Sequence, residues 1–281
     1  MASRMATVVS EHRAGRNDQV VRLAAVGDVH CTKNSQGAFQ PLFAAVAEQA
    51  DVLVLCGDLT DYGQAEEAHV LVRELSAVRV PVVGVLGNHD FESGLQDVVK
   101  EILCTAGVQV LDGDACEING IGFAGVKGFG GGFGPRALGP WGENTIKAFV
   151  REAVDEALKL ESALARLRVE HRVAVLHYSP VQATVEGEPE AIFPFLGCSR
   201  LEEPLNRYPV DAVFHGHAHH GSPDGKTQTG SPVYNVSLPL LRQHNSSTPG
   251  FRVVEVPLAV DQASSGAASN GAAVYEAAAT T

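Results

Sequence analysis

Short apolar runs recur along this chain, and each gives way abruptly to glycine or to polar residues. Runs of this length and β-branched content are typical of strands buried on both faces. Longer segments between them carry apolar residues at helical spacing. The pattern predicts strands over residues 21–26, 51–56, 82–86, 173–176 and 211–215, and helices over 39–49, 64–75, 95–105 and 143–168.

The order of these elements indicates the fold class. Strand and helix alternate from the first strand to the third, which calls for parallel strands joined by right-handed crossovers. We therefore expect an α/β protein. Turn residues separate three short runs and predict a β-meander at 108–111, 116–118 and 122–126. Two later strands, at 233–235 and 251–256, are expected to return the chain to the sheet.

The two ends of the chain differ in composition from the rest. Residues 1–20 mix charged and polar side chains, and residues 261–281 are mostly Ala, Ser, Gly and Thr. Segments with so little apolar surface cannot offset the entropy lost on ordering. We expect a flexible arm over 1–20, one domain over 21–260 and a disordered tail over 261–281.

Charge and cysteine content narrow the possible partners and compartments. The formal net charge of −12 disfavours binding to a long phosphate backbone, so nucleic acid is not the expected partner. No apolar run is long enough to span a membrane, and the first residues lack the apolar core of a signal peptide. The five cysteines are scattered without a C-x-x-C pair, which suits a reducing compartment. We expect a cytoplasmic protein, and its oligomeric state stays open.

Potential metal ligands follow five of the expected strands. Carboxylate, amide and imidazole groups suit divalent Mn, Fe and Zn. Alternate residues of extended D-x-H and H-x-H segments point to the same side, so both side chains can face one site. The ends of strands in α/β sheets are where ligands bind. The candidates are Asp28 and His30, Asp58, Asn88 with His89 and Asp90, His177, and His217 with His219.

These motifs together resemble one known family. The set GDVH, GDLTD, GNHD, a histidine at the end of a strand and GHAH is similar to that of the calcineurin-like metallophosphoesterases. All five motifs occur in the family order, from about residue 23 to residue 257. The resemblance implies a four-layer αββα sandwich of two mixed sheets flanked by helices, with the motifs on loops along one edge.

The resemblance also implies a binuclear centre in which a hydroxide, activated by two divalent metal ions (Mn, Fe or Zn), hydrolyses a phosphoester. The catalytic residue His89 would lie near the substrate phosphate and the leaving group, and Asp90 would orient it. The implied metal ligands are Asp28, His30 and His219 for one ion, Asn88, His177 and His217 for the other, and Asp58 as the bridge between them.

Several functions stay open on these grounds. The preferred one is hydrolysis of a small phosphomonoester or phosphodiester. Cyclic-nucleotide phosphodiesterases of the family share the GDLTDxG and GNHD motifs, and a nuclease is disfavoured by the acidic net charge. A catalytically silent scaffold, like the related retromer subunit, would be expected to lack ligands, and none is missing here.

Substrate specificity is expected in loops outside the five motifs. The glycine-rich loop 125–134 lacks the spacing of nucleotide-binding motifs and is either a lid or a structureless surface connection. The segment 179–200 follows His177 and should overhang the metals. Ser199 to Glu202 forms a capping-box pattern that predicts the start of a short helix. Arg136 and Arg200 are the candidate contacts to a substrate phosphate.

Overall fold

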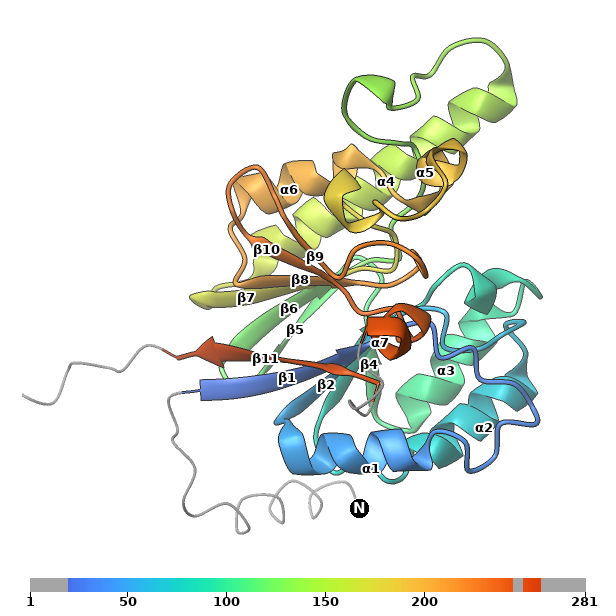
Figure 1. Cartoon of the computed structure of the whole chain (residues 1–281), viewed down its shortest axis with the longest axis vertical. Helices are drawn as coiled ribbons and strands as arrows, with labels where there is room; N and C mark the ends of the chain where they lie inside the picture. The colour runs from blue at the N-terminus through green and yellow to red at the C-terminus, as the bar shows by residue number, and fades with distance from the viewer. Residues whose placement is uncertain (1–19, 245–249, 259–281) are drawn as a thin grey trace, which may run out of the picture.

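The computed structural model describes residues 20–244 and 250–258 (Figure 1). Apart from Val20, the expected flexible arm lies outside these residues, as does the expected disordered tail. The described residues form two mixed sheets that stack face to face, with helices on both outer faces (Figure 1). The four-layer αββα sandwich implied by the sequence motifs is confirmed.

The first sheet is built from the N-terminal part of the chain. Its strand order is β11-β1-β2-β3-β4, with β1 to β4 parallel and β11 antiparallel to β1. This order is what consecutive right-handed crossovers produce from the βαβαβ alternation of the sequence. The strands are β1 (Val20–Val26), β2 (Val52–Cys56), β3 (Val82–Val85), β4 (Val108–Val110) and β11 (Arg252–Pro257).

The second sheet has the order β5-β6-β7-β8-β10-β9. Its four inner strands are parallel, and an antiparallel strand closes each edge. The strands are β5 (Asp114–Ile118), β6 (Ile121–Gly125), β7 (His171–Val175), β8 (Ala212–His215), β9 (Asp224–Lys226) and β10 (Pro232–Asn235).

Helices α1 to α3 cover the first sheet, and α4 and α6 cover the second (Figure 1). Among the described residues, no helix is both long and apolar enough to cross a membrane. The helices are α1 (Gln40–Gln49), α2 (Ala65–Leu75), α3 (Gln96–Thr105), α4 (Asn144–Arg166), α5 (Phe193–Leu196), α6 (Glu202–Arg207) and α7 (Leu238–His244). Short 3₁₀ turns lie at His89–Phe91, Gly134–Arg136, Gln182–Thr184, Glu190–Ile192 and Ser199–Leu201.

The side chains of β2 show how the layers share the core. Leu53 and Leu55 point to the helices of the first sheet, whereas Val52 and Val54 point to the second sheet. Both sets are fully buried. The strand therefore reads as one continuous apolar run, because each of its faces has a partner layer.

The predicted β-meander is wrong. β4 pairs in parallel with β3 and completes the first sheet, whereas β5 and β6 form a hairpin that begins the second sheet. Asn119 and Gly120, both with positive φ, form the two-residue turn of this hairpin. An Asn-Gly pair between two apolar runs predicts such a turn, so the hairpin itself was recognisable in the sequence. The transfer of the chain between sheets was not.

The predicted capping box at Ser199 is also wrong. Glu202 begins α6 after the 3₁₀ turn, and no side chain caps that helix. The Ser199 hydroxyl instead accepts the N–H of Gly134, and the Glu202 carboxylate accepts the N–H of Gln228. Both side chains are used by distant backbone groups, which a local sequence pattern cannot reveal.

The glycine-rich loop 125–134 is neither an open lid nor a surface connection. Most of it is buried, and it packs along the segment that contains α5. The N–H of Gly131 donates to the Pro194 carbonyl at 2.6 Å, and the N–H of Gly132 donates to the Gly197 carbonyl at 2.9 Å. The loop is thus a support for the neighbouring segment.

Glu74 gives a test of the packing between α1 and α2. Its buried carboxylate accepts the N–H groups of Gly37, Phe39 and Gln40, where α1 has no side-chain cap of its own. Removing it would leave backbone donors of the first helical turn unpaired. We expect Glu74→Ala to lower the free energy of unfolding by about 2–4 kcal/mol in urea titrations. The exposed Glu66→Ala should change it by less than about 0.5 kcal/mol, and equal effects would contradict this capping role.

Candidate metal centre

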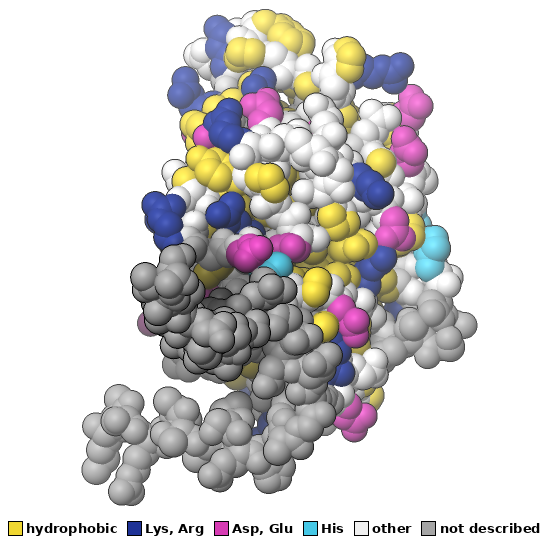
Figure 2. Space-filling view, turned by 90° about the vertical axis from the view of Figure 1, so that its left-hand side faces the viewer, with side chains coloured by type: hydrophobic (Ala, Val, Ile, Leu, Met, Phe, Trp, Pro, Cys, Tyr) yellow, Lys and Arg dark blue, Asp and Glu magenta, His cyan; other side chains and the backbone are white. Residues whose placement is uncertain are grey.

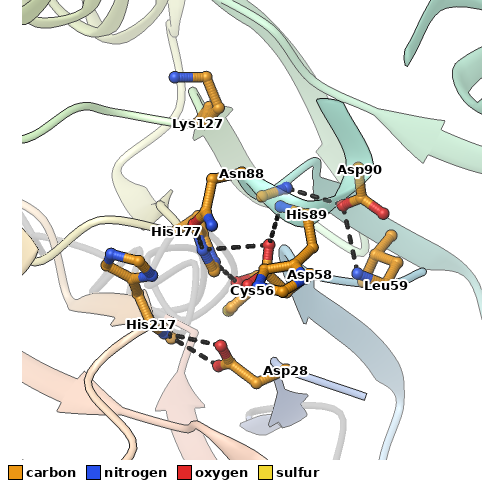
Figure 3. A network of polar contacts seen from close by, with 12 residues as sticks. Asp28, Cys56, Asp58, Leu59, Asn88, His89, Asp90, Lys127, His177 and His217 are labelled. Atoms are coloured by element: carbon orange, nitrogen blue, oxygen red, sulfur yellow. Dashed lines mark hydrogen bonds and ion pairs between the residues drawn. The ribbon is translucent and has the colours of Figure 1, made fainter. Parts of the chain in front are cut away.

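The candidate residues converge on loops at the carboxyl ends of strands from both sheets (Figure 3). Asp28, Asp58 and Asn88 follow β1, β2 and β3 of the first sheet. His177 follows β7, and His217 follows β8, in the second sheet. The two sheets are joined at this edge, because the backbone N–H of His217 donates to the Asp28 carboxylate at 2.9 Å.

Several of these residues have an unusual backbone conformation. Among the described residues, five that are not glycine have a positive φ, and four of them are candidate ligands: Asp28, His30, Asp58 and His217. This left-handed region is uncommon for residues other than glycine, although Asn, Asp and His adopt it more often than the rest. Strain of this kind persists where the surrounding structure holds it, and functional sites are its common location.

Glycines in the same motifs allow the loops to approach closely. A Cβ on Gly57 would lie 2.5 Å from Nδ1 of His177, and one on Gly216 would overlap the Asp28 carboxylate. Any larger residue would push a candidate ligand away. The glycines of the GD and GH motifs are therefore required by the distance between neighbouring loops.

One group of candidate ligands consists of Asp28, His30 and His219, whose ligand atoms all lie within 4.8 Å of one another. Nε2 of His219 lies 3.0 Å from the Asp28 carboxylate. Nδ1 of His30 lies 3.1 Å from the carboxylate of Asp61. Nε2 of His30 is buried and has no hydrogen-bond partner among the described residues. A buried imidazole nitrogen without a partner fits a metal ligand.

A second group consists of Asp58, His177 and His217. His177 is fully buried, and its Nδ1 lies 2.9 Å from the Cys56 carbonyl. This contact fixes the ring so that Nε2 faces Asn88 at 2.9 Å and Asp58 at 3.3 Å.

A backbone carbonyl also fixes the orientation of the His217 ring. Its Nε2 lies 3.0 Å from the Phe195 carbonyl, and a carbonyl can only accept a hydrogen bond. Nε2 therefore carries the proton, which leaves Nδ1 as the nitrogen with a free lone pair. A carbonyl that fixes the tautomer of a histidine is a common support for metal ligands.

Asp58 lies between the two groups. One oxygen of its buried carboxylate is 3.3 Å from Nε2 of His177, and the other is 3.7 Å from Nε2 of His30. The first oxygen also accepts the backbone N–H of His89 at 2.8 Å. One carboxylate thus faces both sets of candidate ligands.

Burial and charge shift the pKa values of this site in opposite directions. Burial disfavours the imidazolium of His177, but the Asp58 carboxylate outweighs it and raises the pKa of His177 to about 9. Burial acts to raise the pKa of Asp58, but the charge and hydrogen bond of His177, together with the hydrogen bond from the His89 backbone, hold it below its ordinary value. Burial, together with the charge of His177, lowers the pKa of His217 to about 4. In the metal-free protein, His177 is therefore the proton carrier and His217 is neutral.

The expectation that Asp90 orients His89 stays a prediction, and the hydrogen bonds of its carboxylate allow only an indirect effect through neighbouring loops. Among the described residues, the fully buried Asp90 carboxylate accepts hydrogen bonds from the N–H groups of Leu59, Thr60 and Gly87 and from the Thr60 hydroxyl. It therefore ties the loop after β2 to the loop after β3. Nδ1 of His89 lies instead 2.8 Å from the backbone carbonyl of Asp61.

Asp61 is a site residue that the sequence reasoning missed. Its carboxylate holds His30 and its carbonyl holds His89, whose ring lies 4.5 Å from the His30 ring. The three side chains also form a further group of potential ligand atoms within 4.8 Å. Asp61 is the last residue of the GDLTD motif, so the sequence did point to it, but no role was assigned to it there.

Among the described residues, the contacts of the two candidate arginines involve none of the candidate ligands. Arg136 is largely exposed and pairs with Glu190 at 3.4 Å. Arg200 lines a surface hollow together with Lys147 and Arg151. Their contact with a substrate phosphate stays a prediction. The segment 179–200, in contrast, does reach the site, since the Phe195 carbonyl contacts His217.

Comparison with known proteins agrees with this geometry. A sequence model of the calcineurin-like phosphoesterases matches residues 21–221. The chain therefore belongs to the calcineurin-like phosphoesterases, a family that generally uses a dinuclear metal centre. No curated protein matches the chain by sequence comparison.

Solved structures share the fold at low sequence identity. Phosphopantetheinyl hydrolase from Mycobacterium tuberculosis has a TM-score of 0.60 at 16% identity, over 83% of this chain and 95% of that chain. A purple acid phosphatase from yellow lupin (Lupinus luteus) seeds has a TM-score of 0.51 at 13% identity, over 80% and 44%. GAP50, an anchor in the inner membrane complex of Plasmodium, has a TM-score of 0.51 at 13% identity, over 85% and 82%. At these identities the likeness concerns the fold alone.

The raised pKa of His177 predicts how metal affinity depends on pH. Below about pH 9, a divalent ion bound through His177 would have to displace the proton that this ring carries. The apparent affinity for Mn²⁺ should therefore rise by up to about tenfold per pH unit between about pH 6.5 and 8. Titration calorimetry across this range measures the effect, and an affinity independent of pH would contradict the protonated His177.

Proposed function

We propose that this chain hydrolyses small phosphomonoesters or phosphodiesters with two divalent metal ions. Two ions bound together lower the pKa of a shared water and neutralise charge on the phosphoryl oxygens. The residues proposed to hold them are Asp28, His30 and His219 for one ion, Asn88, His177 and His217 for the other, and Asp58 for both.

The position of Asp58 is the observation that carries this proposal. Two cations close to one another repel and need an anion between them. The Asp58 carboxylate has one oxygen toward His177 and the other toward His30, as such a bridge requires. The unpaired Nε2 of His30 supports the same interpretation, since a metal would supply its missing partner.

His89 is the proposed proton donor. Its Nδ1 faces the Asp61 carbonyl and its backbone N–H is bonded to Asp58, so the ring is fixed beside the bridging residue. When the ring is an imidazolium, Nδ1–H donates to that carbonyl and Nε2–H stays available for the departing alkoxide. Asp90 would act through the loops that it ties together.

A small substrate fits the charge of the molecule better than a polymer does. The formal net charge is −12, and Figure 2 shows described Lys and Arg side chains interspersed with acidic and hydrophobic ones on the face it presents. A long polyanion would need a continuous basic track.

Asp58→Asn tests the bridge. The amide keeps the shape of the side chain but removes the charge between the two cations, so we expect the variant to bind fewer than two ions per chain. Its hydrolysis of p-nitrophenyl phosphate with Mn²⁺ should fall by at least about a thousandfold. Metal content by mass spectrometry and initial rates measure both, with the exposed Asp114→Asn as the matched control. A wild-type protein that loads two ions and hydrolyses no ester in a panel of monoesters, diesters and cyclic nucleotides would contradict the proposed function.

His89→Ala tests the proton donor. Loss of a general acid typically costs about 10²–10⁴ in rate. We expect kcat on alkyl phosphates to fall by that amount and kcat on p-nitrophenyl phosphate to fall less, because nitrophenolate needs little protonation. Both ions should be retained, and the exposed His69→Ala on α2 should match the wild type. Metal loss from the His89 variant would instead identify this histidine as a ligand.

A further inference from the structure

Lys127 lies on the loop after β6, which borders the loop that carries His177. The residue follows β6, and its backbone carbonyl accepts the N–H groups of His177 and Tyr178 at 3.0 and 3.1 Å. Figure 3 shows Lys127 above Asn88, with its ammonium group on the side that points away from His177 and Asp58. The backbone of Lys127 is thus bonded directly to the loop that carries a proposed ligand.

Three aromatic rings surround this ammonium. Its Nζ lies 4.9 Å from the ring centroid of Phe129, 5.3 Å from that of Tyr178 and 5.4 Å from that of Phe91. Phe91 ends the 3₁₀ turn that begins at His89. The ring of Tyr178 lies 4.4 Å from the ring of His217. Packing therefore connects the cation to both loops that flank the centre.

Among the residues that the structure describes, none forms an ion pair with this ammonium, and the carboxylates that act on it, Glu156, Glu152 and Asp112, lie beyond ion-pair distance. An ammonium has three N–H donors, and one of them donates to the Gly128 carbonyl at 2.8 Å. The nearby Glu156 carboxylate is already used by the Gly128 N–H and by Lys159. Cation–π contacts offset only part of the cost of removing a charge from water. The arrangement is therefore suited to an additional anion.

A cavity of about 240 Å³ lies beside Lys127. Leu86 and Phe91, which flank the residues Gly87 to Asp90, line it together with a second lysine, Lys100. Asp97 and Asp112 also line the cavity, but Asp112 pairs with Lys159 at 2.6 Å. The lining thus contains two lysines and, besides the paired Asp112, one further carboxylate, that of Asp97.

We infer that this cavity, which we call the anion pocket (Leu86, Phe91, Asp97, Lys100, Asp112 and Lys127), binds a second anionic group on the organic part of the substrate. The inference rests on the proposed function, since the metal centre would bind the phosphoryl group that is cleaved. It narrows the substrate class to phosphoesters whose organic part carries a carboxylate or a further phosphate. That anion would accept the free N–H donors of Lys127.

Non-hydrolysable phosphonates separate binding from catalysis. The probes are ω-phosphonoalkanoates of two to six methylenes, their methyl esters, which lack the second charge, and α,ω-bisphosphonates, which carry a phosphonate in its place. Dissociation constants are measured by calorimetry on the full-length, Mn²⁺-loaded protein. The best carboxylate or bisphosphonate should bind at least about tenfold more tightly than the matched methyl ester, as expected for a charge-assisted contact. The tighter of the two identifies the anion.

Lys127→Met should abolish this preference, because Met keeps the apolar stem among the rings and removes the charge. Lys127→Arg should retain part of it, and Lys226→Met, on the edge strand β9, should retain all of it. Equal binding of acid and ester by the wild type, or the same preference in Lys127→Met, would overturn the inference. The corresponding phosphate esters are then assayed for turnover. A preference that depends on Lys127, without hydrolysis of any of these esters, would support the anion pocket and contradict the proposed hydrolysis.

Discussion

The contact on which the candidate site depends most is that of the Asp58 carboxylate with a histidine on either side. His30 follows β1 of the first sheet, and His177 follows β7 of the second. The carboxylate can reach both only when the two sheets are packed face to face. The buried layer between the sheets, with residues such as Val54 and Phe214, therefore also sets the distances among the candidate ligands. The packing of the core therefore also determines the geometry of the candidate site.

Bringing the candidate ligands together strains the backbone of the loops that hold them. Four candidate ligands have a positive φ, and strain of this kind costs about 1–3 kcal/mol per residue. Asp90 offsets part of it, because its buried carboxylate accepts four hydrogen bonds and ties the loop after β2 to the loop after β3. The metal-free site also buries the charged pair of Asp58 and His177. Bound cations would replace the proton shared by this pair. They would then be held by the ligands whose backbone is strained.

Much of the fold and the set of candidate ligands could be predicted from the sequence, for a physical reason. Strands buried on both faces leave continuous apolar runs, and Asp28, Asn88 and His217 stand directly after such runs. The course of the chain between the sheets could not be predicted, because the pairing of β4 with β3 and of β6 with β7 is set by long-range packing. The supports of the site escaped prediction for the same reason. Asp61 holds His89 through a backbone carbonyl, and Lys127 gains its role from rings on three different loops.

The central claim is that Asp58 bridges two metal ions in one site. Low-temperature electron paramagnetic resonance of the protein loaded with two equivalents of Mn²⁺ tests it most directly. We expect the spectrum of an exchange-coupled pair of ions in the wild type, and its loss in Asp58→Asn. The six-line spectrum of isolated Mn²⁺ in the fully loaded wild type would contradict the bridge.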